Sequence, residues 1–197
     1  MLKSCLLSKL VVDVGANIGY FSFIAALSGC RVISFEPVHY NVRQIERTMQ
    51  RNNLPNWRVY RNAVSSVTGG VVHLHTTDGR VNAGNHKIRP GGSDHAYTVR
   101  LDDVIKEDIA FMKIDVEGYE AFVVSGARDL FCKYTVNAVV LEMTEDIKQS
   151  GCDWQRMVQW FLSIGYQMRS FHTMGVVGSQ GRDANMLLVM NIKQPCV

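Results

Sequence analysis

The stretch Leu10–Phe23, LVVDVGANIGYFSF, decides the fold of this chain. Its first residues form an apolar, β-branched run, which is typical of a buried parallel strand. Gly15 and Gly19 follow, and because they lack Cβ atoms they let the backbone turn sharply and approach a ligand closely. The apolar run Tyr20–Ser28 then predicts a helix that stops at Gly29. The pattern is therefore strand, tight glycine turn, helix.

The residues of this turn indicate what it could bind. A dinucleotide-binding turn needs G-x-G-x-x-G, and a phosphate-binding P-loop needs a lysine after its last glycine. The spacing D-x-G-x-N-x-G, from Asp13 to Gly19, meets neither requirement. Asn17 tolerates left-handed backbone angles, and the helix that follows offers free N–H groups. An acid before a glycine turn suits a cationic ligand that carries an amino acid, as S-adenosylmethionine does; a turn without any ligand is the alternative.

Composition is typical of one globular domain. The 197 residues are 47% hydrophobic and 20% charged, and the net charge of +3 is too small to argue for nucleic acid by itself. No window approaches the ~20 apolar residues of a membrane span. No signal peptide is expected, because the first strand already starts at Leu10. We therefore expect a single domain over residues 1–197, located in the cytoplasm.

The cysteines indicate neither a zinc site nor a disulfide framework, because they are odd in number and form no C-x-x-C pair. A reduced, intracellular compartment is the default for such a pattern. The five residues are Cys5, Cys30, Cys132, Cys152 and Cys196.

A second acid ends the next predicted strand. The run Arg31–Phe35 is followed directly by Glu36 and by Pro37, which cannot donate to a strand ladder. In a doubly wound sheet, an acid at this position can accept hydrogen bonds from both ribose hydroxyls of an adenosine. The alternative is a glutamate on the surface at a strand end.

Periodicity predicts the remaining elements in outline. Val71–His75 alternates like an edge strand, and the last two predicted strands should pair as an antiparallel hairpin. Helices are expected at Val38–Asn52, Tyr119–Leu130 and Trp154–Ile164, and strands at Trp57–Tyr60, Phe111–Val116, Ala138–Met143, Tyr166–Phe171 and Ala184–Met190.

The segment Thr76–Tyr97 is rich in glycine, histidine and asparagine and poor in apolar residues. Long irregular segments in compact domains tend to be functional. We expect a loop or hairpin that faces the substrate, in which His86 and His95 could touch the substrate. A solvated histidine is the more common alternative for each.

A second informative stretch is Ala110–Glu120, AFMKIDVEGYE. Strand alternation places Lys113, Asp115 and Glu117 toward one side of the predicted strand. Charges near the end of a buried strand are costly unless they are paired or lie at an open mouth. In an open α/β sheet, that mouth is the ligand crevice at the carboxyl ends of the strands. Glu142 ends the strand after it in the same way.

These motifs together carry a family resemblance. In order and spacing, VVDVGANIGYFSF, SFEP, VRLDDVI, FMKIDVEGYE and VLEM resemble the FkbM family of S-adenosylmethionine-dependent methyltransferases. The resemblance covers Leu10 to about Met190, and Lys113–Glu120 is its most specific part. It implies an α/β fold of the Rossmann-like class I methyltransferase type. Such a fold has a seven-stranded, mostly parallel sheet, helices on both faces and an antiparallel last strand.

The resemblance also implies a cofactor, S-adenosyl-L-methionine, and an activity, O-methylation of a hydroxyl on a sugar or secondary metabolite. It divides the domain into a cofactor-binding half (10–75), a substrate-side loop (76–97) and a catalytic and substrate half (98–197). Glu36 would hold the ribose, and Asn62 and Ala63 would lie beside the adenine. The cofactor-binding residues it implies are Asp13, Gly15, Ala16, Asn17, Gly19, Tyr20, Glu36, Pro37, Asn62, Ala63 and Asp115.

The reaction is expected to need a general base, because a sugar hydroxyl is a weak nucleophile. Our hypothesis is that Asp115 is this base, that Glu117 or Glu142 is the alternate, and that Lys113 pairs with an acid and holds it ionised. A buried ion-pair network that only orders the turn is the alternative. A divalent metal between Asp115 and Glu142 is conceivable, but without a third ligand no metal is expected.

Two other functions remain open at this stage. One is a nicotinamide-dependent Rossmann oxidoreductase, which shares the sheet and the acid after the second strand but not the glycine spacing. The other is a non-catalytic methyltransferase-like binding domain. The expected partner is a small-molecule or glycan substrate, with neither nucleic acid nor a membrane span. The sequence does not indicate an oligomeric state.

Overall fold

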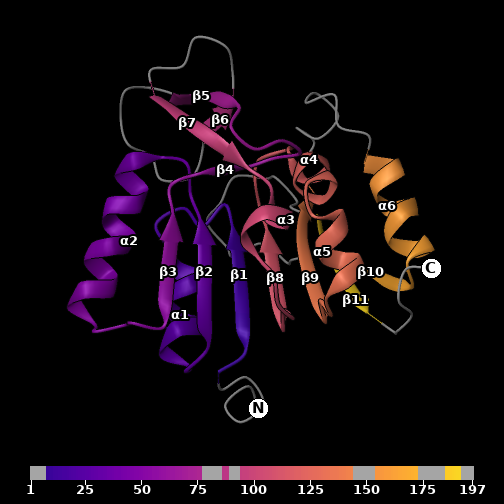
Figure 1. The fold of residues 1–197 in the computed structure, drawn as a ribbon, viewed down its shortest axis with the longest axis horizontal. Helices are drawn as coiled ribbons and strands as arrows, with labels where there is room; N and C mark the ends of the chain where they lie inside the picture. The colour runs from indigo at the N-terminus through magenta and orange to yellow at the C-terminus, as the bar shows by residue number, and fades with distance from the viewer. Residues whose placement is uncertain (1–7, 77–85, 89–93, 144–153, 173–184, 192–197) are drawn as a thin grey trace.

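The computed structural model describes residues 8–76, 86–88, 94–143, 154–172 and 185–191. Within these ranges, the chain forms an α/β sandwich around one large sheet (Figure 1). The strands are β1 Leu10–Val14, β2 Arg31–Phe35, β3 Trp57–Tyr60, β4 Ala63–Val64, β5 Val71–Thr76, β6 His86–Ile88, β7 Asp94–Val99, β8 Phe111–Ile114, β9 Ala138–Met143, β10 Tyr166–His172 and β11 Asn185–Asn191. The helices are α1 Tyr20–Leu27, α2 His39–Arg51, α3 Leu101–Val104, α4 Glu120–Ser125, α5 Arg128–Lys133 and α6 Trp154–Ser163.

The large sheet has the strand order β10-β11-β9-β8-β1-β2-β3. Five neighbouring strands, from β9 to β3, are parallel, as expected for this class of α/β fold. Strand β11 pairs antiparallel with both β9 and β10. Because β1 lies centrally, between β8 and β2, the glycine turn that follows it meets the turns that follow both neighbours.

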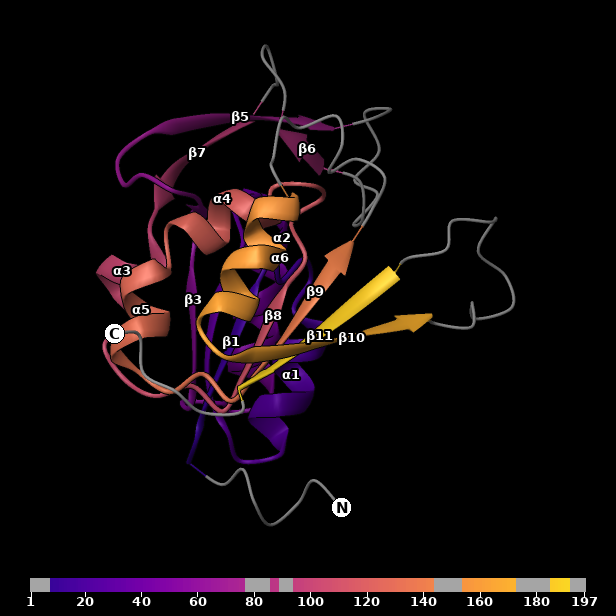
Figure 2. The same cartoon turned by 90° about the vertical axis from the view of Figure 1, so that its right-hand side faces the viewer.

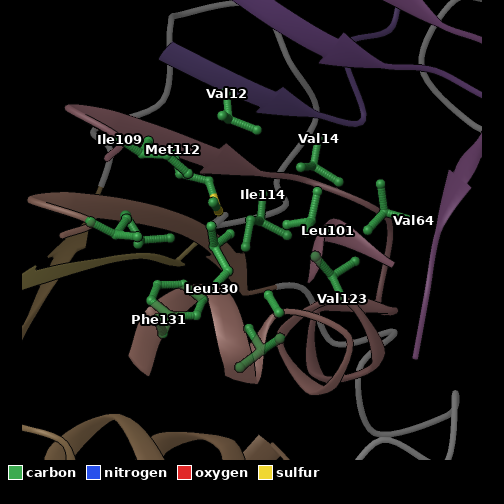
Figure 3. Packing of buried hydrophobic residues seen from close by; sticks show 14 of the residues in the cluster. Val12, Val14, Val64, Leu101, Ile109, Met112, Ile114, Val123, Leu130 and Phe131 are labelled. Atoms are coloured by element: carbon green, nitrogen blue, oxygen red, sulfur yellow. The ribbon is translucent and has the colours of Figure 1, made fainter. Parts of the chain in front are cut away.

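Helices cover both faces of the sheet (Figure 2). Helices α1 and α2 pack on one face over an apolar cluster that includes Ile45 and Trp57. Helices α3 to α6 pack on the other face over a larger cluster (Figure 3). In that cluster Met112 and Ile114 of β8 are fully buried, which is the alternation predicted for this strand. No helix among the described residues is long and apolar enough to cross a membrane.

A second, smaller sheet has the order β4-β7-β5-β6 and lies above the carboxyl ends of the large sheet (Figure 1). Leu74 of β5 and Ala96 of β7 pack on Val38, just before α2. Strand β5 lies between β6 and β7, so the prediction of an edge strand at Val71–His75 is wrong: the segment that follows, predicted as a loop or hairpin, supplies strands on both sides. Residues 77–85 and 89–93 of that segment lie outside the described residues.

The predicted helix Tyr119–Leu130 is two short helices, α4 and α5, rather than one. The break falls at Gly126, where a side chain has no room, because an added Cβ would lie 2.1 Å from the carbonyl oxygen of Ser65. Asp102 then accepts hydrogen bonds from the backbone N–H groups of Asp129 and Leu130 at the start of α5. Both causes are contacts between distant parts of the chain.

Candidate functional site

A cleft lies at the carboxyl ends of the parallel strands, beneath the smaller sheet. Its walls come from the turns after β1, β2 and β8, from the start of α2 and from the segment after β3. The residues that line it are Val14, Gly15, Asn17, Phe35, Glu36, Pro37, Val38, Asn41, Asn62, Ala63, Val64, Leu74, Asp115, Val116, Glu117 and Tyr119. The residues predicted for the methionine, ribose and adenine parts of a cofactor are therefore represented in one cleft.

The first wall is the glycine turn between β1 and α1. The N–H groups of Gly15 and Ala16 both donate to the carbonyl oxygen of Phe35, at 3.0 and 3.1 Å, so the turn is fixed to the end of β2. Gly15, Asn17 and Gly19 all have left-handed backbone angles, with φ of 82°, 53° and 83°. Such angles favour glycine and asparagine, which explains the residue types that drew attention in the sequence.

Asp13 lies beneath this turn rather than in the cleft. Its side chain is buried, and its Oδ2 accepts a hydrogen bond from the Ser22 hydroxyl of α1 at 2.6 Å. Burial raises the pKa of Asp13, partly offset by the nearby Lys113 ammonium. The carboxylate therefore ties the first strand to the first helix and supports the turn from below.

Glu36 forms the second wall and is 5% exposed. Its Oε2 accepts the N–H of Asn17 at 2.8 Å, and its Oε1 accepts the N–H of Val38 at 2.9 Å and the side-chain amide of Asn41 at 3.3 Å. Burial raises the pKa of Glu36 to about 7, although these hydrogen bonds oppose the shift. Glu36 thus joins the glycine turn to the start of α2, and it is not the surface glutamate considered as the alternative.

Two buried oxygen atoms beside Glu36 lack a hydrogen-bond partner in the described structure: Oδ1 of Asn17 and Oδ1 of Asn41. Buried polar atoms normally have a hydrogen-bond partner, so unpaired polar atoms in a cleft suggest that a ligand supplies the partner. Each carboxylate oxygen can accept two hydrogen bonds, and Oε2 of Glu36 accepts one from the described residues. These groups, together with the bare backbone at Gly15, fit the hydroxyls and amine of an adenosyl amino acid. Asn41 was not predicted from the sequence, because a polar residue in a first helical turn is usually solvated.

The third part of the cleft lies after β3. Asn62 and Ala63 line it, and the side-chain amide of Asn62 donates to the carbonyl oxygen of Tyr97 at 3.0 Å. The neighbouring Arg61 bonds with Asp94 and with the carbonyl oxygen of His95. These contacts attach the smaller sheet to the large one at the edge of the cleft.

The charged residues after β8 and β9 form one interacting group. Nζ of Lys113 lies 2.6 Å from Oδ2 of Asp115, so the predicted pairing of Lys113 with an acid is present. Burial raises the pKa of Asp115, but a hydrogen bond with Glu142 and the Lys113 ammonium outweigh it, and the net pKa is lowered. The same hydrogen bond, with burial, raises the pKa of Glu142 to about 8. The two carboxyl groups are therefore coupled, and their hydrogen bond acts on their pKa values in opposite directions.

The turn after β8 has an unusual backbone. Glu117 has φ of 53°, although it is not a glycine, and Gly118 follows with φ of 100°. Glu120, the first residue of α4, is fully buried, and its Oε1 accepts the N–H groups of Val116 and Gly118 at 3.1 and 3.2 Å. The sequence suggested only that an acid at this position suits the start of a helix.

Six predicted site residues are not among the described residues that line the cleft: Asp13, Ala16, Gly19, Tyr20, Lys113 and Glu142. Gly19 packs on Trp57 and Ile45, where an added Cβ would approach within 2.7 Å. Tyr20 is 73% exposed. Lys113 and Glu142 reach the site through Asp115.

The two histidines named in the sequence analysis lie in the smaller sheet. His95 is exposed on β7, paired in register with His73 of β5. The backbone of His86 lies in β6. Among the described residues, no group of three His, Cys, Asp or Glu side chains gathers closely enough to hold a metal ion.

Comparison with known proteins gives a family match and a set of structural matches. A family model described as the methyltransferase FkbM domain matches residues 13–168. No curated protein matches the sequence significantly. The methyltransferase FkbM from Methylobacillus flagellatus KT has a TM-score of 0.64 at 20% identity, over 92% of this chain and 43% of that one. This chain therefore spans less than half the length of that structure.

Two further structures were solved with S-adenosylhomocysteine (SAH) bound. One is a protein from Streptococcus mutans described as a methyltransferase, with a TM-score of 0.59 at 8% identity, over 96% of this chain and 93% of that one. The other is the O-methyltransferase from Bacillus cereus, with a TM-score of 0.53 at 14% identity, over 93% of this chain and 74% of that one. At these identities the likeness shows the α/β fold.

Proposed function

This chain belongs to the FkbM methyltransferase family, and on that premise we propose that it transfers a methyl group from S-adenosyl-L-methionine to a hydroxyl of a sugar or secondary metabolite. One observation carries the proposal. The glycine turn, Glu36, the pair Asn62 and Ala63, and Asp115 come from four separate parts of the chain and line a single cleft. This is where open α/β sheets bind their ligands.

The cofactor would be held along this cleft. Glu36 would accept hydrogen bonds from ribose hydroxyls, with Pro37 beside it, and Asn62 and Ala63 would lie beside the adenine. Gly15 and Asn17 would face the amino-acid end, while Asp13, Ala16 and Gly19 would support the turn from outside the cleft. Tyr20 is exposed and is assigned no contact with the cofactor. The unpaired oxygens of Asn17 and Asn41 support this assignment, because a bound ligand would supply their missing donors.

The bound cofactor supplies an already activated methyl group on a sulfonium. The protein must therefore align an acceptor oxygen and remove its proton. We assign the proton to Oδ1 or Oδ2 of Asp115, which lines the cleft and whose pKa is lowered by its contacts with Glu142 and Lys113. Lys113 pairs with Asp115 and favours its ionised form, Glu142 hydrogen-bonds to it, and Glu117 lines the same cleft.

The architecture we propose is the class I methyltransferase arrangement, with seven strands and an antiparallel last strand. The strand order and the antiparallel pairing of β11 support it. Residues 10–75 would form the cofactor half, residues 76–97 the substrate side, and residues 98–197 the catalytic half. A small-molecule or glycan acceptor fits the carboxylates at the mouth better than nucleic acid does, because phosphates would be repelled there.

Calorimetric titration of the purified chain with S-adenosylmethionine, S-adenosylhomocysteine (SAH) and NAD tests the proposal. We expect micromolar binding of the two adenosyl ligands and no binding of NAD. Tight binding of NAD alone would support a nicotinamide-dependent oxidoreductase instead. Binding of the adenosyl ligands without methyl transfer, in a screen of glycan and polyketide hydroxyls, would support a non-catalytic binding domain.

A further inference from the structure

Glu120 is a buried acid to which the proposed reaction gives no part. It is the first residue of α4, and its side chain is fully buried. One of its oxygens, Oε1, accepts the N–H groups of both Val116 and Gly118. The other, Oε2, is buried and has no hydrogen-bond partner among the described residues.

The two N–H groups that Glu120 binds flank a single residue, Glu117. That residue has a left-handed backbone, which side chains other than glycine and asparagine rarely adopt. A backbone of this kind persists only where its surroundings fix it, and it is concentrated at functional sites. Because both flanking N–H groups converge on one oxygen, Glu120 holds the backbone on each side of Glu117 in place.

The turn that Glu120 holds carries part of the cleft wall. Asp115, Val116 and Glu117 all line the cleft. The carbonyl oxygen of Asp115 also packs directly against Gly15 of the opposite turn. A shift of the turn after β8 would therefore move the proposed base and press on the glycine turn together, and displacements of about 1 Å are enough to impair a site.

Burying the Glu120 side chain also costs more free energy than is needed for a residue that only starts a helix. A carboxylate with one unpaired, buried oxygen loses hydration that its remaining hydrogen bonds do not replace. Burial accordingly raises the pKa of Glu120 to about 7. Local rules are broken in this way mainly at functional sites.

We propose that Glu120 is a positioning residue, whose carboxylate clamps the turn Asp115–Gly118 and so sets the position of Asp115 and Glu117 in the cleft. The inference rests on the proposed function for the ligand that the cleft takes. Glu120 touches neither ligand nor acceptor in this account, and acts through the turn.

The test compares Glu120→Ala and Glu120→Gln with a matched control, Asp102→Ala. Asp102 is also a buried acid, and its carboxylate also accepts two backbone N–H groups, those of Asp129 and Leu130, but it lies outside the described lining of the cleft. Binding of SAH is measured by calorimetry. Hydrogen exchange of the Val116 and Gly118 amides is measured by NMR.

We expect Glu120→Ala to weaken SAH binding by at least ~10-fold and to speed exchange of both amides by at least ~10-fold. Glu120→Gln keeps an acceptor oxygen and should stay within ~3-fold of the wild-type affinity, since each hydrogen bond contributes modestly. Asp102→Ala should lower the melting temperature but leave the affinity within ~2-fold, because distant sites act independently.

The inference is overturned if Glu120→Ala binds SAH as the wild type does, or weakens binding no more than Asp102→Ala does. It is also overturned if the two amides keep their protection in Glu120→Ala. Absence of SAH binding by the wild-type chain would instead refute the proposed function. In that case the amide exchange still decides whether Glu120 clamps the turn.

Discussion

Gly15 and Asp115 are in direct contact across the cleft floor. A Cβ atom added to Gly15 would lie 1.8 Å from the carbonyl oxygen of Asp115, which is closer than two nonbonded heavy atoms can come. The N–H of Asp115 in turn donates to the carbonyl oxygen of Val14. The two motifs that stand out in the sequence, about 100 residues apart, are thus packed against each other through their backbones.

Replacing Gly15 with alanine should therefore remove SAH binding and destabilise the fold. Overpacking costs about 1–3 kcal/mol, and the left-handed backbone adds about 1–2 kcal/mol. Gly69→Ala is the matched control, because Gly69 has nearly the same φ, 84° against 82°, but nothing lies within 4 Å of its added Cβ. Urea unfolding and SAH calorimetry measure both variants. Equal losses of stability and of SAH affinity in the two variants would show that the contact with Asp115 is unimportant.

Replacing Asp115 with asparagine should reduce methyl transfer by about 10²–10⁴-fold, because it removes the proposed base. SAH affinity should change little, since asparagine keeps the size of the side chain. The acceptor identified in the hydroxyl screen is used for the rate measurement. Asp129→Asn, which weakens an exposed ion pair with Lys133, serves as control. An unchanged turnover number in Asp115→Asn with intact SAH binding would remove Asp115 from the role of base.

Stability should fall as the pH rises through the neutral range. Glu36 has a pKa raised to about 7 in the folded chain, against an ordinary value of 4.5, so the folded state binds its proton more tightly. The resulting stabilisation is fully present below about pH 4.5 and is lost as the pH rises through about 7. Glu120 contributes in the same direction. The free energy of unfolding, measured with urea between pH 5 and 8, should therefore decline less steeply with pH in Glu36→Gln than in the wild type, although some decline should remain. The same slope in both proteins would contradict this.

Replacing Phe131 with alanine should destabilise the chain by about 3–5 kcal/mol. Phe131 of α5 makes edge-on contacts with Trp160, Phe161 and Tyr166, at centroid distances of 5.1–5.9 Å, and so links α5 to α6 and β10. Leu162→Ala on the exposed side of α6 should cost less than about 0.5 kcal/mol. Thermal and urea unfolding compare the two variants. Similar losses of stability in both would mean that the aromatic cluster does not fix α6 to the rest of the fold.

The core strands could be predicted from sequence because local signals and tertiary position agree there. Strands β2, β3 and β9 have the predicted bounds, because each is a short segment that contains β-branched or aromatic residues. The break between α4 and α5 could not be predicted, because it depends on Ser65 and Asp102 in distant parts of the chain. The position of β5 depends likewise on strands within a segment that has little apolar content.

Part of the candidate site could also be predicted, because local signals and tertiary position agree there too. Glycine turns and acids at strand ends are local signals in the sequence, so Gly15, Glu36 and Asp115 could be predicted as residues of one crevice. Asn41 and Glu120 carry no such signal, because their importance comes from burial, which only the packed chain reveals. That Asp13 faces Ser22 rather than the cleft is likewise a matter of packing.

The short parallel pairing of β4 with β7 has a consequence for how this fold can change. It pairs Ala63 with Thr98 and Val64 with Val99 within the smaller sheet, so the segment between Val64 and Thr98 starts and ends at neighbouring points. Lengthening a segment whose ends are already fixed together costs little, because closure entropy grows only slowly with length. The segment between β4 and the end of β7 can therefore differ in length and sequence between related chains. Such a change would alter which side chains reach the cleft and would leave the strands that hold the turns unchanged.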